Sequence, residues 1–260
     1  MTAPASCASR GEPSATDLDP ADTFGRALVD ALDGGEEPLS VERDDGWRDE
    51  YGAALYLNGP EAWAPAARRA LEALNGRVLD LGAGGGRHAS LLAQRGCDVL
   101  AVDISPGAVE TCRRRGLCAM RGAIGEPGLL ADERFDAVLL LGHNLGLLRS
   151  ADRAVAILMW LADRCRSGAV LVGDSLDTTM TAQPGWDSYH ELNRERGRRP
   201  GEARMRICYA GSCGDWFDYW LMSPQELADA SVDTPWELER VEFDEDERYA
   251  GDYVATLRRR

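Results

Sequence analysis

The stretch RVLDLGAGGGRHASLLAQRGCDVLAVDIS, residues 77–105, decides the fold. A short apolar run leads into closely spaced glycines, a helical pattern follows, and a second apolar run ends at Asp103. Strand, loop, helix and strand in this order indicate a βαβ unit with parallel strands. The glycines leave the backbone bare at the end of the first strand, where such sheets bind their ligands.

Strands and helices continue to alternate after this unit. Further strands are predicted at residues 117–124, 134–144, 169–175, 236–244 and 251–259, and further helices at 106–116, 151–168 and 223–231. Two more β-like stretches, at residues 203–211 and 215–223, follow the fifth strand. Near-continuous apolar strands separated by helices are typical of a parallel sheet covered on both faces. The sequence therefore predicts an α/β fold with a doubly wound, mostly parallel seven-stranded sheet and an antiparallel edge.

The segments around this sheet differ in composition. Residues 1–22 are rich in Ala, Ser, Pro, Asp and Thr, which predicts a disordered tail. Residues 23–260 are predicted to form a single domain. The domain is predicted to begin with an N-terminal helical cap (23–74), which a ligand-binding core follows (77–174). An insertion on the substrate side comes after the fifth strand (175–222), and a C-terminal helix with strands ends the domain (223–260).

The formal net charge of the 260 residues is −15. Nucleic-acid binding depends on Lys and Arg side chains that neutralise phosphates, so this balance argues against a nucleic-acid partner. No apolar run approaches the roughly 20 residues of a membrane helix, and the N-terminus lacks the apolar core of a signal peptide. We therefore expect a cytoplasmic protein without a membrane partner.

The cysteine pattern predicts neither disulfides nor a metal site. The chain contains no C-x-x-C pair, and no histidine stands at ligand spacing from a cysteine pair. In a cytoplasmic chain such residues are expected to be reduced thiols. The seven cysteines are Cys7, Cys97, Cys112, Cys118, Cys165, Cys208 and Cys213.

Two ligands compete for the glycine loop, a dinucleotide and S-adenosylmethionine. A dinucleotide site has the pattern G-x-G-x-x-G, but a count from Gly82 places Arg87 at the third glycine. Glycines instead occupy positions 82, 84 and 86, and Asp80 stands two residues before the first. This spacing resembles motif I of the class I S-adenosylmethionine-dependent methyltransferases. A carboxylate at the loop suits a sulfonium cation with an amine and would repel a pyrophosphate.

The resemblance extends to both flanks. VERDDGWRDEYGAALYLNGPEAW (41–63), YHELNRERGRRPGEARMRI (189–207) and WFDYWLMSPQEL (216–227) are similar to segments of a group of small bacterial and archaeal methyltransferase-domain proteins. That group has diverse or unassigned acceptors. The resemblance therefore implies a reaction class, with S-adenosylmethionine as cofactor and S-adenosylhomocysteine as product, and leaves the acceptor open.

The resemblance also implies cofactor-binding residues. Asp103 would accept the ribose hydroxyls, and Ile104 would lie against the adenine. Ala123 and Ile124 stand where the family contacts the adenine amine, although the usual acidic residue there is missing. The residues expected to bind the cofactor are Asp80, Gly82, Ala83, Gly84, Gly86, Arg87, Asp103, Ile104, Ser105, Ala123, Ile124, Gly142 and Asn144.

Candidates for catalysis come from the three histidines. A hydroxyl acceptor needs a base with a pKa near neutral, which histidine supplies. His143 follows the fourth strand at the expected reaction end and is the first candidate for this base, and His190 in the insertion is the second. Asp174, at the end of the fifth strand, is a weaker candidate. No metal is expected.

The acceptor pocket is predicted to be roofed by the N-terminal segment and the insertion. Aromatic residues gather in these two parts, and pockets for small organic ligands are mainly apolar and aromatic. The arginine-rich run 193–206 either pairs with the chain's acids or contacts an anionic acceptor. The candidate substrate-binding residues are Tyr51, Tyr56, Trp63, Tyr189, Arg194, Arg196, Trp216 and Tyr219.

The sequence leaves several functions open. The favoured one is methyl transfer to an oxygen or nitrogen of a small molecule, such as one of specialised metabolism. A methyltransferase acting on protein or tRNA is the first alternative. An NAD-dependent oxidoreductase and a non-catalytic S-adenosylmethionine-binding module are the others. Fold alone does not separate these functions, because function depends on the site.

Overall fold

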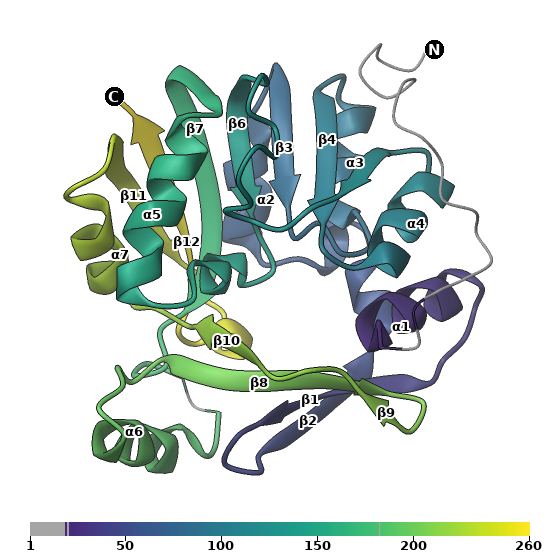
Figure 1. Cartoon of the computed structure of the whole chain (residues 1–260), viewed down its shortest axis with the longest axis vertical. Coiled ribbons are helices and arrows are strands. Elements are labelled where there is room, and N and C mark those ends of the chain that lie inside the picture. Colours follow the sequence, from purple (N-terminus) through teal and green to yellow (C-terminus); the bar gives the residue numbers. More distant parts are fainter. Residues whose placement is uncertain (1–18, 20, 182) are drawn as a thin grey trace.

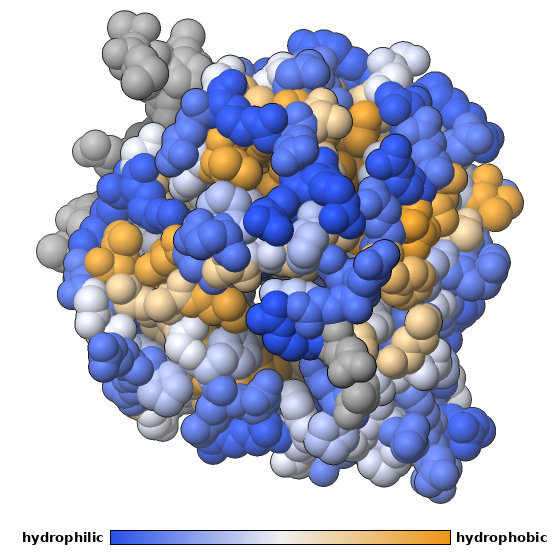
Figure 2. Space-filling view, turned by 180° about the vertical axis from the view of Figure 1, so that it is seen from behind, coloured by the Kyte–Doolittle hydropathy of each residue, from blue (hydrophilic) through white to orange (hydrophobic). Residues whose placement is uncertain are grey.

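The computed structural model describes residue 19 and residues 21–181 and 183–260. The predicted disordered tail therefore lies mostly outside the described residues, as does Cys7. In the part of the chain that is described, no helix combines the length and apolar character that a membrane crossing requires. Hydrophilic side chains cover much of the surface seen in Figure 2.

Seven strands form the central sheet (Figure 1). In spatial order they are β11 (Trp236–Phe243), β12 (Asp252–Arg259), β7 (Cys165–Leu176), β6 (Phe135–Leu140), β3 (Arg77–Leu81), β4 (Asp98–Asp103) and β5 (Cys118–Arg121). The strands from β7 to β5 pair in parallel, and β12 is antiparallel to both β7 and β11. The predicted α/β fold with a mostly parallel seven-stranded sheet and an antiparallel edge is confirmed.

Helices cover both faces of this sheet because successive strand residues point to opposite sides. In β3, Val78 belongs to one hydrophobic cluster, while Leu79 and Leu81 belong to the other. One face is covered by α2 (Pro65–Glu72), α3 (Arg87–Gln94) and α4 (Pro106–Arg114), and the other by α5 (Ala151–Ala162) and α7 (Pro224–Ser231).

A second, antiparallel sheet faces the carboxyl ends of the parallel strands (Figure 1). Its strands, in spatial order, are β10 (Phe217–Trp220), β8 (Glu202–Tyr209), β1 (Pro38–Arg43) and β2 (Arg48–Gly52), and β9 (Ser212–Cys213) pairs with β8. The N-terminal segment and the insertion thus share one sheet. The remaining elements are α1 (Thr23–Leu32), α6 (Trp186–Glu195), and the 3-10 turns η1 (Ala53–Tyr56), η2 (Pro60–Ala62), η3 (Asn144–Leu148) and η4 (Glu247–Tyr249).

The helical cap predicted at residues 23–74 also contains strands in its middle part, to which the sequence assigned no element. There the β1–β2 hairpin forms, and Leu39 stands opposite Tyr51. Leu39 is fully buried beneath Ala27 of α1, and both belong to one small hydrophobic cluster. The hairpin escapes sequence analysis because its strands are short, and because β1 gains its second partner from distant residues, 205–208 of β8.

The expectation of reduced thiols is wrong for one pair. Cys208 and Cys213 form a disulfide across the β8–β9 hairpin, where the two residues stand opposite each other. A separation of five residues does not identify a pair unless the chain turns between them, and this turn was not predicted. Cys97, Cys112 and Cys165 keep their thiols, as expected.

Asp22, assigned to the tail by the sequence, fixes the start of two helices. Its Oδ1 accepts the Gly25 N–H at 2.9 Å, and its Oδ2 accepts the Ser105 hydroxyl at 2.9 Å and the Gly107 N–H at 2.8 Å. Asp22→Ala is expected to lower the free energy of unfolding by about 1–3 kcal/mol, measured in urea, because these bonds cap both helices. Glu36→Ala, an exposed acid on the following loop, is the control. Equal stability of the two variants would contradict the role.

Candidate functional site

The glycine loop joins β3 to α3 and bends through left-handed backbone conformations. The φ of Gly82 is +67°, which favours glycine. A Cβ at Gly82 would lie 2.6 Å from the Asn144 amide nitrogen, so a larger residue does not fit. Asn144 donates in turn to the carbonyl oxygens of Leu81 and Gly82, at 3.2 and 2.8 Å. These contacts fix the loop against the turn that follows β6.

Asp103 stands at the end of β4, beside this loop. Its carboxylate is buried and accepts N–H groups from Gly84 and Ser105, each at 2.9 Å. Burial raises its pKa although these hydrogen bonds oppose the rise. A carboxylate has more acceptor positions than these two bonds occupy. Asp103 thus both braces the loop and keeps acceptor capacity for a ligand.

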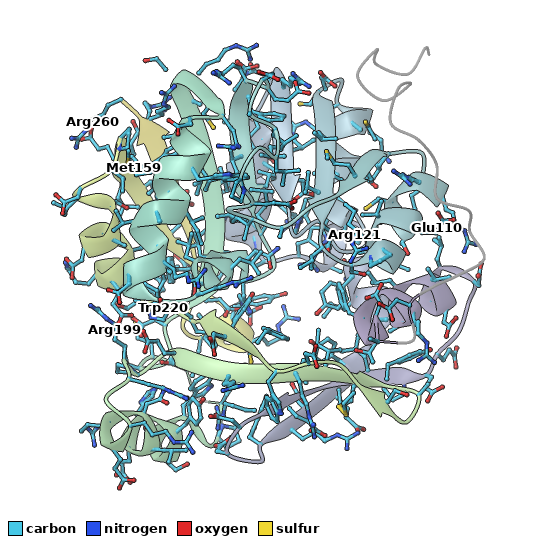
Figure 3. All side chains as sticks on the ribbon, viewed as in Figure 1. Glu110, Arg121, Met159, Arg199, Trp220 and Arg260 are labelled. Atoms are coloured by element: carbon cyan, nitrogen blue, oxygen red, sulfur yellow. A yellow bond between two sulfur atoms is a disulfide. The ribbon has the colours of Figure 1, made fainter. Side chains whose placement is uncertain are left out.

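Ile104, the next residue, leaves 61% of its surface exposed, which is unusual for a large apolar side chain beside a buried strand. Its carbonyl accepts a hydrogen bond from Arg121, labelled in Figure 3. Ala123 donates its N–H to the Glu126 carboxylate at 3.1 Å. An acid is therefore present near the expected adenine side, three residues beyond the position at which the sequence lacks one.

Asp80 lies in β3 and is 1% exposed. Burial raises its pKa to about 7, and the nearby Asp103 charge contributes. One of its carboxylate oxygens has no hydrogen-bond partner among the described residues. A buried polar atom without a partner is costly, so this oxygen fits a ligand that brings a positive charge or an N–H donor. It does not fit a pyrophosphate.

The other predicted cofactor residues also surround the loop. Arg87, largely withdrawn from solvent, donates to the Leu55 carbonyl at 3.1 Å, and Gly142 has a φ of +92° close to its guanidinium. Burial lowers the pKa of Arg87, and the charge of Asp174 opposes this change. Ser105 caps α4 and donates its hydroxyl to Asp22, so its hydroxyl serves the fold.

Beyond β6 the chain places His143 in a left-handed conformation, with φ +62°. Its backbone N–H donates to Asp174 Oδ1 at 2.7 Å, and its Nε2 lies 3.2 Å from Asp252 Oδ1. The Tyr219 hydroxyl donates to its carbonyl oxygen at 2.7 Å. Asp174 and Tyr219 therefore hold the backbone of His143, and Asp252 holds its imidazole, of which 41% is exposed.

Opposing effects set the pKa of His143. Burial lowers the pKa, whereas the hydrogen bond to Asp252 and the charges of Asp252 and Asp174 raise it. Together the raising effects outweigh burial, so the pKa lies above its usual value. Burial raises the pKa of Asp174 itself. The Asp252 carboxylate binds Nε2 of His143 and thereby also orients the imidazole.

Two of the predicted tyrosines, Tyr51 and Tyr56, meet beside the glycine loop. The hydroxyls of Tyr51 and Tyr56 lie 3.1 Å apart, and Tyr56 packs edge-on against Phe24 with ring centroids at 5.0 Å. A Cβ at Gly84 would touch Phe24 and Tyr56 at 3.5 and 3.6 Å. The aromatic side chains therefore face the glycine loop. Sequence reasoning missed Phe24, whose only signal is its place in an amphipathic helix.

Tyr219 reaches the same region from β10. A Cβ at Gly146 would lie 2.3 Å from the Tyr219 ring, so this tyrosine packs directly on η3. Burial raises the pKa of Tyr219 well above its usual value, and the charge of Asp174 adds to the rise. The insertion and the N-terminal segment thus both contribute tyrosines near the end of the parallel strands.

Several predicted site residues lie in clusters of their own. Trp63 is buried against His88, with ring centroids at 4.7 Å. Tyr189 and Arg196 both bind Asp44, at 2.6 and 2.7 Å. These residues therefore stabilise the core and the region around the second sheet. Their composition alone could not show this, because tertiary contacts decide which aromatic residues face a ligand.

The other three predicted residues are also outside this region. His190 lies 3.0 Å from Thr178 Oγ1 and beside Trp186. Trp216 stacks on Arg206 at 4.7 Å, and Arg194 is exposed on α6. Within the described part of the chain, no hydrogen bond or ion pair joins any of these three residues to His143.

Comparison with known proteins defines the class. Residues 78–167 match the family model described as a methyltransferase domain. An S-adenosylmethionine-dependent methyltransferase from Bacteroides fragilis, solved with S-adenosyl-L-homocysteine, is 25% identical, with a TM-score of 0.75 over 93% of this chain and 97% of that chain. The CcbJ methyltransferase from Streptomyces caelestis is 19% identical, with a TM-score of 0.56 over 93% and 99%. A further S-adenosylmethionine-dependent methyltransferase, from Methanosarcina mazei, is 17% identical, with a TM-score of 0.52 over 70% and 92%.

No curated protein gives a significant match in sequence. The glycine loop, the sheet order and the family match define a class I methyltransferase fold. The chain is an S-adenosylmethionine-dependent methyltransferase, and its cofactor is S-adenosylmethionine. The competing dinucleotide interpretation of the loop is thereby set aside.

Proposed function

We propose that this enzyme methylates a small molecule at an oxygen or nitrogen atom, beneath the second sheet. One observation carries the proposal: Tyr56, with Tyr51 at its hydroxyl, lies against the glycine loop, and Tyr219 binds the carbonyl of His143. Because a sheet covers the carboxyl ends of the parallel strands, the approach is suited to a small molecule rather than a folded macromolecule. The net charge of −15 adds weight against tRNA.

The cofactor is proposed to lie across the carboxyl ends of β3 and β4. Asp103 would accept the ribose hydroxyls, and the exposed side chain of Ile104 would cover one face of the adenine. The unpartnered oxygen of Asp80 supports a place for the cofactor's positively charged end beside β3. The bare backbone at Gly82 and Gly84 allows the close approach that these contacts need.

S-adenosylmethionine supplies a methyl group on a sulfonium, which is already strongly electrophilic. An acceptor oxygen or nitrogen attacks the methyl carbon, the carbon–sulfur bond breaks, and its electron pair remains on sulfur in S-adenosylhomocysteine. The protein then has to align the acceptor and exclude water. His143 is proposed to take the acceptor's proton, and Asp252 to orient the imidazole.

The affinity for S-adenosylmethionine is expected to fall as the pH is lowered through about 7. Asp80 has a pKa of about 7, so it loses its charge below that pH and no longer attracts a cation. Linkage of one proton limits the loss to about tenfold per pH unit. Calorimetry from about pH 8 to about pH 6 measures the trend, and Asp80→Asn should bind weakly at every pH. An affinity of the native protein that is unchanged below pH 7 would show that Asp80 does not face the cofactor.

The proposed acceptor class is tested by release of S-adenosylhomocysteine from the full chain. The panel contains small hydroxyl, amine and carboxylate compounds, a protein extract and unmodified tRNA. Turnover with a small molecule, lost in Tyr219→Ala while cofactor binding persists, supports the proposal. Turnover confined to the protein extract or tRNA would replace it with the macromolecular alternative.

A further inference from the structure

A cavity of about 360 Å³ opens between the second sheet and the amino end of α5. Four arginines line it, and we call it the arginine cleft: Arg149, Arg153, Arg198 and Arg204. The acids in its wall are Glu202 and Asp218. Arg199 and Trp220 are labelled below α5 in Figure 3 and mark this part of the molecule. Arg199 shortly precedes β8, and Trp220 ends β10.

The cleft is positively charged in a strongly acidic chain. Of its four arginines, Arg198 has an ion pair, which it shares on Asp44 with Arg196. Within the described ranges, no ion pair is found for Arg149, Arg153 or Arg204, although the chain has 44 acidic residues and 29 basic ones. Other arginines of the described residues also lack an ion pair, but these three are exposed and gather around one cavity. Asp218 stands opposite Arg204 in the sheet, so the wall acids offset part of this charge and leave an excess of arginines.

The backbone adds to this positive character. Ser150 is the N-cap of the 12-residue helix α5, and its side chain makes no capping hydrogen bond. The first N–H groups of a helix carry partial positive charge and bind anions when no side chain caps them. Asp152, in the first turn of α5, offsets part of this charge without capping the helix. Arg149 itself has a φ of +67°, a conformation that a non-glycine residue adopts at a cost and that gathers at binding sites.

The arginine cleft adjoins the methyl-transfer end of the protein. Arg149 follows η3, which begins directly after His143. Asp218, in the cleft wall, precedes Tyr219, whose hydroxyl binds the His143 carbonyl. A second cavity, of about 190 Å³, shares Arg149 and Arg153 and extends to Ile124 on the expected adenine side. The cleft is therefore built on β10 and next to η3, the two elements that hold the turn of His143. Asp218 and Tyr219 point to opposite faces of β10, so an acceptor would reach the cleft around this strand, which is the outer strand of the second sheet.

We propose that the arginine cleft binds an oxyanion, the carboxylate or phosphate group of the acceptor. Arginine pairs with either group through two parallel hydrogen bonds, and a site with three unpaired guanidiniums and a free helix end fits such a group. This inference rests on the proposed function, because it places an anionic end on the acceptor. It also narrows the acceptor class to organic acids and phosphate esters.

Binding is tested by calorimetric titration of the full chain, saturated with S-adenosylhomocysteine, with inorganic phosphate and separately with citrate. The native protein should bind at least one of them, and Arg153→Gln and Arg204→Gln should each weaken this binding by about 10-fold or more. Arg240→Gln, an exposed arginine of β11 paired with Glu242, should bind as the native protein does. The preferred anion tells a phosphate from a carboxylate.

Two results of this titration would overturn the proposal. One is the lack of millimolar binding of either anion, and the other is equal binding by all four proteins. Methylation of matched pairs of acceptors, with and without an acidic group, separates this test from the proposed function. The cleft variants should raise KM for the acidic member about 10-fold and leave the neutral member unchanged. Equal loss for both members, or loss of S-adenosylhomocysteine binding, would also reject the cleft as an acceptor site.

Discussion

Asp103→Ala is expected to bind S-adenosylmethionine about 100-fold more weakly than the native protein. The buried carboxylate would hold two ribose hydroxyls through hydrogen bonds to a charged group, each worth about 1.5–3 kcal/mol. It also holds the Gly84 N–H at 2.9 Å, so its loss frees the loop that the cofactor needs. Calorimetry with S-adenosylmethionine and S-adenosylhomocysteine measures the effect.

Asp98→Ala is the matched control, because Asp98 begins the same strand and is 43% exposed at its opposite end. Asp103→Asn keeps the shape and one acceptor oxygen, and should fall between the native protein and Asp103→Ala. Thermal unfolding of each variant shows whether the loop change has spread to the fold. If folded Asp103→Ala bound within about threefold of the native protein, the ribose would have to be held elsewhere.

The central sheet could be predicted from sequence because its signals are local and strong. Parallel strands buried on both faces read as continuous apolar runs, as in residues 99–102 and 137–141. The glycine loop adds a backbone requirement that few residues meet. At Gly82 a side chain would clash with Asn144. Packing therefore requires a glycine at this position, and this requirement is what the glycine spacing in the sequence shows.

The second sheet could not be predicted because its pairing is long-range. The β-like stretches at residues 203–211 and 215–223 are predicted from sequence and form β8 and β10. Val41, however, stands opposite Ile207, far along the chain, and nothing in the sequence identifies residues 38–43 as this partner. The fate of the aromatic residues depends on the same pairing. Tyr56 faces the glycine loop, while Trp63, seven residues later, is buried in the core. The amino-acid composition of the segment does not distinguish these two positions.

His143→Asn is expected to lower kcat for a hydroxyl acceptor by about 100-fold or more, the usual contribution of a general base. Asparagine tolerates the left-handed conformation that His143 adopts, so the turn after β6 and the bond from Tyr219 to the backbone carbonyl should survive. His190→Asn is the control, since His190 binds Thr178 instead. Cofactor affinity, measured on both variants, should stay near native. Equal kcat in the two variants would rule out His143 as the base.

The pH profile distinguishes a base from a residue that only shapes the site. A base acts when neutral, so kcat should fall as the pH is lowered through the pKa of His143, which lies above the usual value. Asp252→Asn removes the charge and weakens the hydrogen bond that raise this pKa, and burial then dominates. The acidic limb of the profile should therefore move to lower pH in this variant. A limb that stayed in place, with kcat reduced at every pH, would mean that Asp252 supports the structure and that another group takes the proton.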